Sequence, residues 1–179
     1  RRLRWCLLEQ KPRLRRRPGD AGSTDETKDI INSFIKVPNF IPLIYKESLR
    51  MPVAFNKCLE NSHGEWFVKL DADDIVSPEH VEDLIREAKE ADADMVFGDF
   101  IKGLGEEIDQ NVPTNIEQIF RACSIGLCSA IVKKSACDDI GRFDELMTFS
   151  EDWEFIIRMI KSGKKVVKGQ KTGYVWRII

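Results

Sequence analysis

The strongest chemical signal in the chain is the acidic run Asp71-Ala72-Asp73-Asp74, which directly follows the largely apolar segment 65–70. Residues two apart in an extended chain face the same side, so Asp71 and Asp73 converge. Two carboxylates at one point repel unless a cation joins them, and hard oxygen ligands favour Mg²⁺ or Mn²⁺, often completed by substrate phosphates. The same residues also suit a solvated acidic turn in which Asp74 interacts with the next helix dipole. The spacing alone leaves both interpretations open.

The surrounding pattern predicts the elements that must position this acidic run. Segments 65–70, 94–101 and 129–132 have the character of strands, as do the shorter segments 40–45, 165–167 and 174–176. Helical spacing of apolar residues predicts helices over 52–61, 115–123 and 150–161, and Ser77-Pro78-Glu79 begins another. Strands that alternate with helices indicate an α/β sheet that is largely parallel. Such sheets bind ligands at the carboxyl ends of their strands, where Asp71 stands.

Two local pairings are also predicted. Ser23-Thr24-Asp25-Glu26 has the spacing of a capping box before a helix that contains Ile30, Ile31, Phe34 and Ile35. This spacing favours helix capping over catalysis for Ser23, Asp25 and Glu26. Arg158 follows Glu154 by one helical turn, which predicts an ion pair within that helix.

Composition limits the class of protein. The chain has 179 residues, 42% hydrophobic and 32% charged, as expected for one globular domain with a real core. It has no run of 18 apolar residues that would predict a membrane-spanning helix. Its five cysteines include no Cys-x-x-Cys pair, so we expect neither a disulfide framework nor a zinc site, and a reduced, cytoplasmic setting.

Charge is divided unevenly along the chain. Residues 1–17 contain seven arginines and Lys11 against Glu9, whereas the whole chain has a net charge of −2, so the remainder is acidic. A basic arm can contact nucleic acid or an anionic membrane. The acidic body lacks interleaved basic and aromatic residues, so we expect no nucleic-acid partner.

Four stretches of the chain, in order, resemble the motifs of family 2 glycosyltransferases of the GT-A type. The resemblance extends over about residues 20–177 and rests on Asp20-Ala21-Gly22-Ser23-Thr24-Asp25-Glu26-Thr27, on Ala54-Phe55-Asn56-Lys57 with Gly64 to Asp74, on Ile140 to Glu145, and on Glu151-Asp152-Trp153-Glu154 with Arg158. It implies a Rossmann-like α/β sheet flanked by helices. It also implies transfer of a sugar from a nucleotide-diphosphate sugar to an acceptor hydroxyl, with inversion at the anomeric carbon.

The resemblance assigns roles to individual residues. Asp20 and Asn56 would contact the nucleotide, and Asp71 would lie at the ribose and the metal. Asp73 would bind Mg²⁺ or Mn²⁺ directly. Asp152 would be the general base that takes the proton of the acceptor hydroxyl, with Glu151 supporting it or touching the acceptor.

The resemblance also implies partners and a place of action. It implies a nucleotide-diphosphate sugar as donor and a glycan or lipid-linked acceptor, within glycan or polysaccharide biosynthesis. Assembly of glycans on a lipid carrier is a common task in the family. A cytoplasmic protein with peripheral association at the inner face of the membrane is therefore compatible with the family pattern.

The first 19 residues depart from the family pattern. The segment Leu7-Leu8-Glu9-Gln10 resembles the end of the family's first helix, and the strand expected before it is absent. Segment 11–19 is too polar for a buried strand and too broken by prolines for a long helix. We therefore expect residues 1–19 to be an atypical arginine-rich segment not native to the fold, through a misread start, an altered reading frame or truncation. Residues 20–179 would then form a partial, N-terminally incomplete GT-A domain with uncovered apolar edges.

Two alternatives to an active transferase follow from the sequence. The first is a truncated or degenerate glycosyltransferase-like domain without activity, and the departure at residues 1–19 favours it. Phe55 also stands where many family members have arginine, which would remove one phosphate or base contact. The second is a sugar-phosphate nucleotidyltransferase, which would need a glycine-rich phosphate loop near its start, and the sequence has none.

Overall fold

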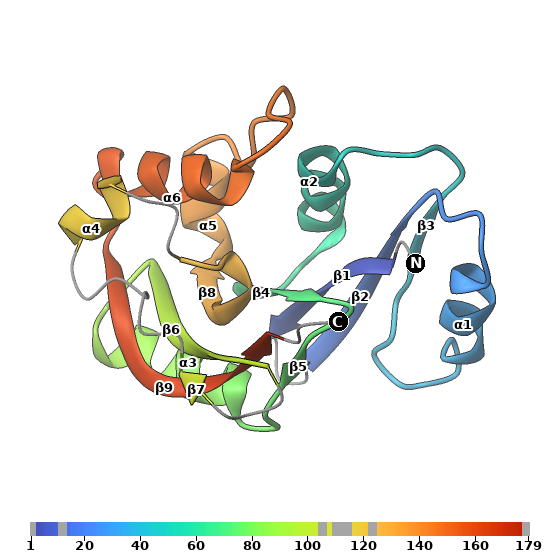
Figure 1. Ribbon diagram of the computed structural model, residues 1–179, viewed down its shortest axis with the longest axis horizontal. Helices are drawn as coiled ribbons and strands as arrows, with labels where there is room; N and C mark the ends of the chain where they lie inside the picture. The colour runs from blue at the N-terminus through green and yellow to red at the C-terminus, as the bar shows by residue number, and fades with distance from the viewer. Residues whose placement is uncertain (1–2, 11–13, 104–106, 109–115, 122–124, 177–179) are drawn as a thin grey trace.

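The computed structural model describes residues 3–10, 14–103, 107–108, 116–121 and 125–176 (Figure 1). The strands are β1 Leu3–Gln10, β2 Leu14–Ala21, β3 Leu43–Tyr45, β4 Trp66–Asp71, β5 Ile75–Val76, β6 Met95–Lys102, β7 Glu107–Ile108, β8 Ala130–Lys133 and β9 Val166–Trp176. The helices are α1 Thr27–Ser33, α2 Met51–Asn61, α3 His80–Glu90, α4 Ile116–Arg121, α5 Lys134–Asp139 and α6 Glu151–Lys161. The strands form one nine-stranded sheet in the order β3-β2-β1-β4-β8-β6-β9-β5, with β7 paired to β6.

The sheet is mixed, so the prediction of a largely parallel sheet was wrong. Among the described strands, the β2–β3 and β6–β9 pairs are parallel and the other pairs are antiparallel. Three residues separate β1 from β2, which suffices for a hairpin and is far too short for a parallel crossover. In the centre, β8 runs antiparallel between β4 and β6.

The N-terminal strands overturn two further expectations. Segment 7–10 belongs to β1, not to a helix end, and β2 includes most of the segment that we expected to be too polar for a buried strand. Pairing with β4 and β3 supplies backbone hydrogen bonds that local propensity does not anticipate, and Arg17 is only 4% exposed. Residues 1–2 and 11–13 lie outside the described residues. The foreign origin of residues 1–19 and the partial character of residues 20–179 stay predictions.

The other main elements agree with the sequence pattern. Helices α2, α3 and α6 and strands β4, β6 and β8 lie within a residue or two of their expected positions, and β9 joins the two expected closing strands into one. Helix α5 was not predicted. The expected ion pair in α6 is present, with Arg158 Nε 2.6 Å from Glu154 Oε1.

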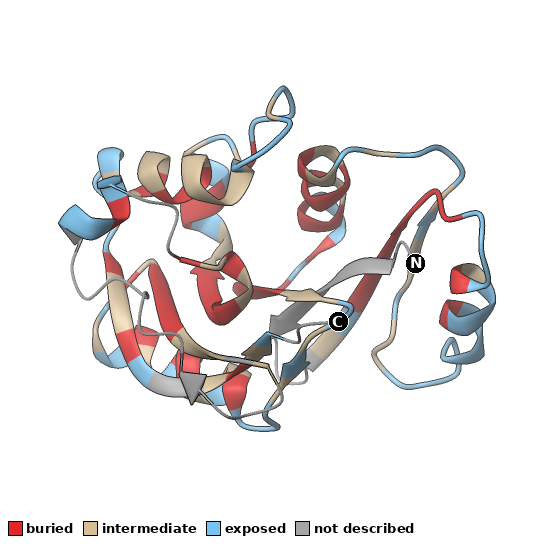
Figure 2. Cartoon of the chain, viewed as in Figure 1, coloured by how far each residue is buried: buried red, intermediate tan, exposed pale blue. Residues whose placement is uncertain are grey.

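Two apolar layers enclose the sheet, as the buried segments in Figure 2 indicate. Helices α2, α5 and α6 cover one face and α3 covers the other (Figure 1). Along β4, Trp66 and Val68 pack toward α3, whereas Phe67 between them packs toward α2 and α6. A strand covered on both faces requires almost every side chain to be apolar or paired.

A chain of aromatic rings fixes β4, α2 and α6 relative to one another. Phe55 packs edge-on against Phe67 at 5.7 Å and against Phe143 at 4.7 Å, and Phe143 stacks on Phe155 at 4.4 Å between centroids. Such pairs contribute about 0.5–1.5 kcal/mol each beyond their burial. Phe55, which is fully buried, therefore serves as a core residue here.

Apolar surface is left uncovered around α1. Ile30, Phe34 and Ile35 are between 50% and 57% exposed, and Val37 and Ile44 are about two-fifths exposed. We expected uncovered apolar edges because the first strands of the family pattern were expected to be absent, but β1 and β2 lie beside β4, and the exposed apolar surface lies around α1 and β3 instead. Single exposed apolar residues are normal on protein surfaces. A contiguous group of them marks a surface that can bind another molecule.

We predict that the buried histidine of α3 makes the fold sensitive to acid. His80 is 2% exposed beside the Tyr174 ring, and burial lowers its pKa to about 4. Because an unfolded histidine takes up its proton near pH 6.5, this contribution to stability is complete above that pH and is lost as the pH falls toward 4. Between pH 7 and pH 5 the free energy of unfolding should fall by about 2 kcal/mol from this group.

Urea unfolding at the two pH values measures this effect. His80→Gln should remove most of the difference, whereas His63→Gln, at an exposed position, should keep it. An equal acid loss in the His80→Gln and wild-type proteins would refute the prediction.

Candidate functional site

The acidic turn is fixed between β4 and the end of β9. Asp71 is the last residue of β4, and the Asp74 N–H donates back to the Asp71 carbonyl over 3.2 Å. The Tyr174 hydroxyl, from β9, donates to the Asp74 carboxylate. Immediately afterwards β5 pairs with β9, Ile75 opposite Val175. Asp73, between these anchors, is exposed, so its carboxylate reaches the surface at the tip of the turn.

A buried lysine lies under the acidic turn. Lys69, on β4, is 4% exposed, and its Nζ is 3.0 Å from Asp71 Oδ1 and 3.1 Å from Asp71 Oδ2. The same Nζ is 3.6 Å from Asp152 Oδ2. Burial works to lower the pKa of Lys69, but the charges of Asp152 and Asp71 outweigh it and raise that pKa. Sequence reasoning assigned no role to Lys69.

Asp152 comes to this site from the first turn of α6. Its side chain is 21% exposed, and burial raises its pKa, while the Lys69 charge opposes the rise. Asp152 Oδ1 is buried and has no hydrogen-bond partner among the described residues. Burial likewise raises the pKa of Asp71, again opposed by Lys69. Glu151, the neighbouring predicted residue, is half-buried.

Asp20 is the next-to-last residue of β2 and is fully buried. Its Oδ1 accepts a hydrogen bond from the Ser23 N–H at 3.0 Å, and its Oδ2 has no partner within the described part of the chain. Gly22 has φ +82°, and a Cβ there would lie 2.6 Å from the Glu47 carbonyl group. Only glycine fits this approach without strain, so the turn holds Asp20 in place.

The expected capping box is absent from this turn. Ser23 is buried and its Oγ has no partner in the described structure, and Glu26 makes no side-chain cap. Instead Asp25 Oδ1 accepts from the Thr27 N–H at 3.0 Å. Hydrogen bonding by the side chain of Thr27, and then by its backbone N–H, lowers the pKa of Asp25. The Asp20–Ser23 hydrogen bond draws Ser23 toward the sheet, which explains why it does not cap α1.

Strand register brings Asp20 and Asp71 to the same end of the sheet, at the carboxyl ends of β2 and β4. On β1, Leu3 pairs with Asp20 and Trp5 pairs with Asp71. Strands β2 and β4 run in the same direction on either side of β1, so their carboxyl ends meet at this end, roughly 10 Å apart. The structure thus brings Asp20, Asp71, Asp73 and Asp152 to one end of the sheet, and the roles that the resemblance implies for them stay predictions.

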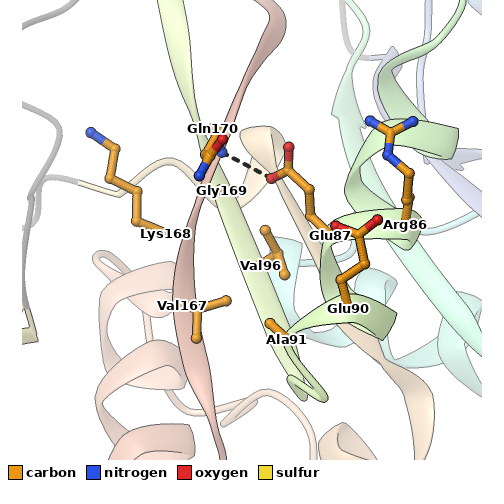
Figure 3. Close-up of a pocket in the computed structure, with 9 residues that line it drawn as sticks. All are labelled: Arg86, Glu87, Glu90, Ala91, Val96, Val167, Lys168, Gly169 and Gln170. Atoms are coloured by element: carbon orange, nitrogen blue, oxygen red, sulfur yellow. Dashed lines mark hydrogen bonds between the residues drawn. The ribbon is translucent and has the colours of Figure 1, made fainter.

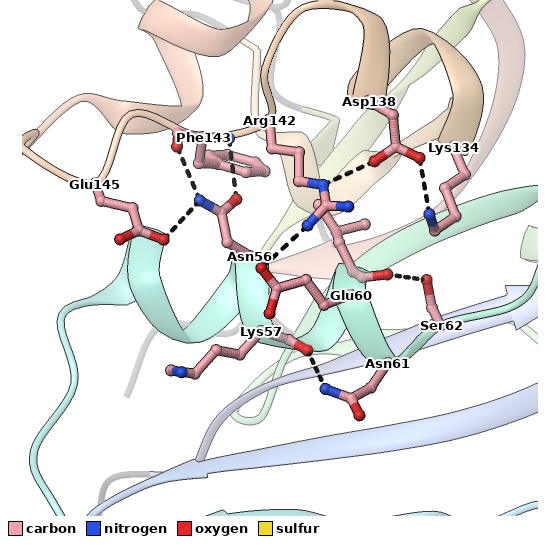
Figure 4. A network of polar contacts seen from close by, with 11 residues as sticks. Asn56, Lys57, Glu60, Asn61, Ser62, Lys134, Asp138, Arg142, Phe143 and Glu145 are labelled. Carbon is pink, nitrogen blue, oxygen red and sulfur yellow. Dashed lines mark hydrogen bonds and ion pairs between the residues drawn. The ribbon is translucent and has the colours of Figure 1, made fainter.

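Asn56 is engaged elsewhere. From α2, its Nδ2 donates to the Phe143 carbonyl at 2.9 Å and to Glu145 Oε1 at 3.0 Å, and its Oδ1 accepts from the Phe143 N–H at 3.0 Å (Figure 4). Both amide hydrogens are therefore used to hold the loop before α6. Nearby, Arg142 joins Asp138 and Glu60, which ties the same loop to α5 and α2 (Figure 4). Contact of Asn56 with a nucleotide stays a prediction.

We predict that Asn56 stabilises the loop that leads to α6. Asn56→Ala would leave the buried backbone groups of Phe143 unpaired, which should cost about 2–3 kcal/mol in the free energy of unfolding. Asn61→Ala is a matched control, because Asn61 is exposed on the same helix and donates only to the Lys57 carbonyl (Figure 4). It should change stability by less than about 0.5 kcal/mol. Urea unfolding of both variants measures the difference, and equal costs would contradict the assigned role.

Two of the hollows in the described part of the chain lie beside the sheet. An apolar one of about 510 Å³ lies beside the acidic turn, between α1 and the β2–β4 region, and is lined by Arg16, Pro18, Ile30, Ile31, Phe34, Val37, Phe40, Leu70, Asp71, Ala72 and Asp74. The other, of about 430 Å³, lies between α3 and β9, with Glu87 accepting from the Gln170 N–H at 2.9 Å (Figure 3). Only the first touches the predicted site residues.

Comparison with known proteins agrees with this fold. The chain matches the model of Glycosyl transferase family 2 over residues 6–143, and it therefore belongs to that family. Its fold is similar to that of S. aureus TarS 1-349 in complex with UDP-GlcNAc, with a TM-score of 0.75 and 19% identity. That match covers 89% of this chain and 48% of the TarS chain.

Sequence relatives point in the same direction. The chain is 26% identical over 100 residues to the putative glycosyltransferase EpsH of Bacillus subtilis (strain 168), covering 56% of this chain and 28% of EpsH. It is 32% identical over 82 residues to the glycosyltransferase GlyG of Streptococcus pneumoniae, covering 45% of this chain and 27% of GlyG. Each alignment therefore spans less than a third of the relative.

Proposed function

We propose that this chain is a glycosyltransferase catalytic domain that transfers a sugar from a nucleotide-diphosphate sugar to an acceptor hydroxyl. The observation that carries this proposal is the meeting of Asp71, from the end of β4, with Asp152, from the start of α6, on either side of Lys69. In this proposal Asp71 serves the donor and Asp152 serves the acceptor. A transfer reaction needs both at one point.

The donor would bind along the carboxyl ends of β2 and β4. Asp20 Oδ2 is buried without a partner among the described residues, which suits acceptance of the ring N–H of a uracil or guanine base. The exposed Asp73 would lie at the diphosphate. UDP-GlcNAc is the ligand of the TarS structure, so a uridine nucleotide is the first donor to test.

Asp71 and Asp73 would bind a divalent cation only together with the diphosphate of the donor, which would supply further oxygen ligands. No group of three or more metal-ligating side chains is present in the part of the chain that the structure describes. Asp71 is committed to Lys69, so Asp73 would supply the principal protein ligand and donor phosphates the others. When bound, Mg²⁺ or Mn²⁺ would neutralise charge on the departing diphosphate.

Asp152 would act as the general base. The acceptor oxygen forms a bond to the anomeric carbon while the bond from that carbon to the phosphate oxygen breaks, and the diphosphate leaves with the electron pair. Asp152, whose side chain is 21% exposed, would take the hydroxyl proton on its carboxylate. Entry opposite the leaving group would invert the anomeric centre. NMR of the product tests this, and retained configuration would refute it.

The acceptor would be a glycan or a lipid-linked saccharide. Among the described helices, none combines the length and apolarity needed to cross a bilayer. The exposed apolar residues around α1 are compatible with peripheral contact of a cytoplasmic protein with a membrane surface. Polysaccharide or glycan biosynthesis is the process that such an acceptor implies.

Calorimetric titration of UDP and of GDP, each with and without Mn²⁺, tests the proposal. We expect one nucleotide to bind only when Mn²⁺ is present, which would also identify the base of the donor. If neither nucleotide binds to a protein that unfolds cooperatively, the proposal fails.

A second candidate is a catalytically inactive domain of the same family. It is favoured by the commitment of two predicted donor-side residues to contacts within the chain, Asn56 to the loop before α6 and Asp71 to Lys69. An inactive domain would release no nucleoside diphosphate from any sugar nucleotide, even in the presence of Mn²⁺. The turnover assay described in the Discussion separates the two candidates.

A further inference from the structure

We propose that Lys69 is a positioning residue for the transfer reaction, an internal counter-ion that holds the donor-side Asp71 and the acceptor-side Asp152 in one arrangement. This inference rests on the proposed function for its catalytic consequence. Its geometric basis is independent, because it uses only the contacts of the three side chains.

The first step is the burial of Lys69. Its side chain is 4% exposed on a strand that is covered on both faces. Lysine is almost never buried to this degree unless it is paired, because an isolated ammonium group loses its hydration. The buried ammonium group of Lys69 is therefore stabilised by the carboxylates next to it.

The second step is the way in which Lys69 contacts the two carboxylates. Its Nζ lies nearly equidistant from the two oxygens of Asp71, at 3.0 Å and 3.1 Å, and 3.6 Å from Asp152 Oδ2. The contact therefore occupies one oxygen of Asp152 and leaves Oδ1 without a partner among the described residues. Lys69 can fix the direction of the Asp152 carboxylate without using the oxygen that would take the proton.

The third step is the net charge of the cluster. Two carboxylates at this spacing repel each other, and a single ammonium between them removes most of that repulsion. The same ammonium weakens the attraction of the site for a free divalent cation. Together with the commitment of Asp71, this favours entry of the metal with the donor diphosphate over entry of the metal alone.

Substitution of Lys69 distinguishes a positioning role from a merely structural one. A positioning role predicts that Mn²⁺ binds more tightly while kcat falls. Lys69→Met keeps the length of the side chain and removes its charge, so Mn²⁺ alone, followed by electron paramagnetic resonance, should bind about tenfold more tightly. Release of nucleoside diphosphate from the sugar nucleotide should fall about 100-fold in kcat, with the KM of the donor changed less than about threefold.

Two further variants complete the test. Lys69→Arg restores the charge and should bring kcat back to within about tenfold of wild type, with Mn²⁺ binding again weak. Lys168→Met removes the lysine of another ion pair of the sheet, in which Nζ is 2.8 Å from Asp99, and should change neither readout.

The outcomes decide between the explanations. Parallel weakening of Mn²⁺ binding and of turnover, together with a lower melting temperature, would assign Lys69 a structural role and overturn the inference. Unchanged Mn²⁺ affinity and kcat in Lys69→Met would overturn it as well. If the wild-type chain binds no nucleotide, the proposed function fails, whereas the Mn²⁺ measurement still decides whether Lys69 is the counter-ion of the site.

Discussion

Replacement of Asp152 by asparagine should reduce turnover about 10³-fold while leaving nucleotide affinity within about threefold of wild type. Asparagine has nearly the same shape as aspartate, and its amide oxygen can still lie near the Lys69 ammonium group. It cannot, however, accept the proton of the acceptor hydroxyl. In the proposed site the donor would bind to groups on β2 and β4, so its affinity should not depend on this carboxylate. The loss should therefore appear in kcat and not in the KM of the donor.

Release of UDP from UDP-GlcNAc, or of the diphosphate from whichever sugar nucleotide the calorimetry selects, measures this effect. Glu154→Gln is the matched control on the same helix, because Glu154 pairs with Arg158 and lies away from Lys69. It should retain at least half of the activity. An Asp152→Asn protein with normal kcat would show that another group takes the proton, or that the reaction needs no base.

Replacement of Asp73 by alanine should weaken the Mn²⁺-dependent binding of nucleotide by about 100-fold or more. Asp73 lies at the exposed tip of the acidic turn, and Asp71, the other predicted ligand, is neutralised by Lys69. Loss of the principal protein ligand should thus remove most of the contribution of the metal, since the remaining ligands would come from phosphates and water. Binding measured without Mn²⁺ should hardly change.

Calorimetry with Mn²⁺ held in excess gives the comparison. Asp139→Ala is a suitable control, because Asp139 forms an exposed ion pair with Lys164 and such pairs contribute little. Its affinity for nucleotide should equal that of wild type. Metal-dependent binding that survives in Asp73→Ala would show that the ion is held elsewhere, and the roles of Asp71 and Asp73 would have to be reassigned.

The parts of the site that sequence could predict are those with a local signature. The apolar segment before Asp71 specified β4, and the periodic apolar residues of α6 placed Asp152 at the start of that helix. Their meeting could not be derived from spacing, because it depends on the order and register of the strands. It came only from the resemblance to family 2 glycosyltransferases.

Lys69 was missed although the sequence contains a signal for it. Its neighbours in β4 are apolar on both sides of the strand, which indicates a strand covered on both faces. A lysine in such a strand must be paired, and the nearest carboxylate of the same face is Asp71, two residues later. Lys69 looks like an exposed residue only if the strand is taken to have one solvated face.

The relative direction of the strands in the sheet could not be predicted, for a different reason. Segments 3–10 and 14–21 have weak strand propensity, with many arginines and two prolines nearby, and pairing with β4 and β3 determines their structure. Such tertiary pairing overrides local propensity more readily in strands than in helices. The helices α2, α3 and α6 were predicted well because their periodicity is a property of each segment alone.

A crystal structure of the chain with UDP and Mn²⁺ would examine the proposed donor site directly. The predicted result is a nucleotide along the carboxyl ends of β2 and β4, with its base beside Asp20, its diphosphate and the metal at Asp73, and Asp152 facing the position of the sugar. A nucleotide bound in the hollow between α3 and β9, or a metal held away from Asp73, would contradict the proposed glycosyltransferase site.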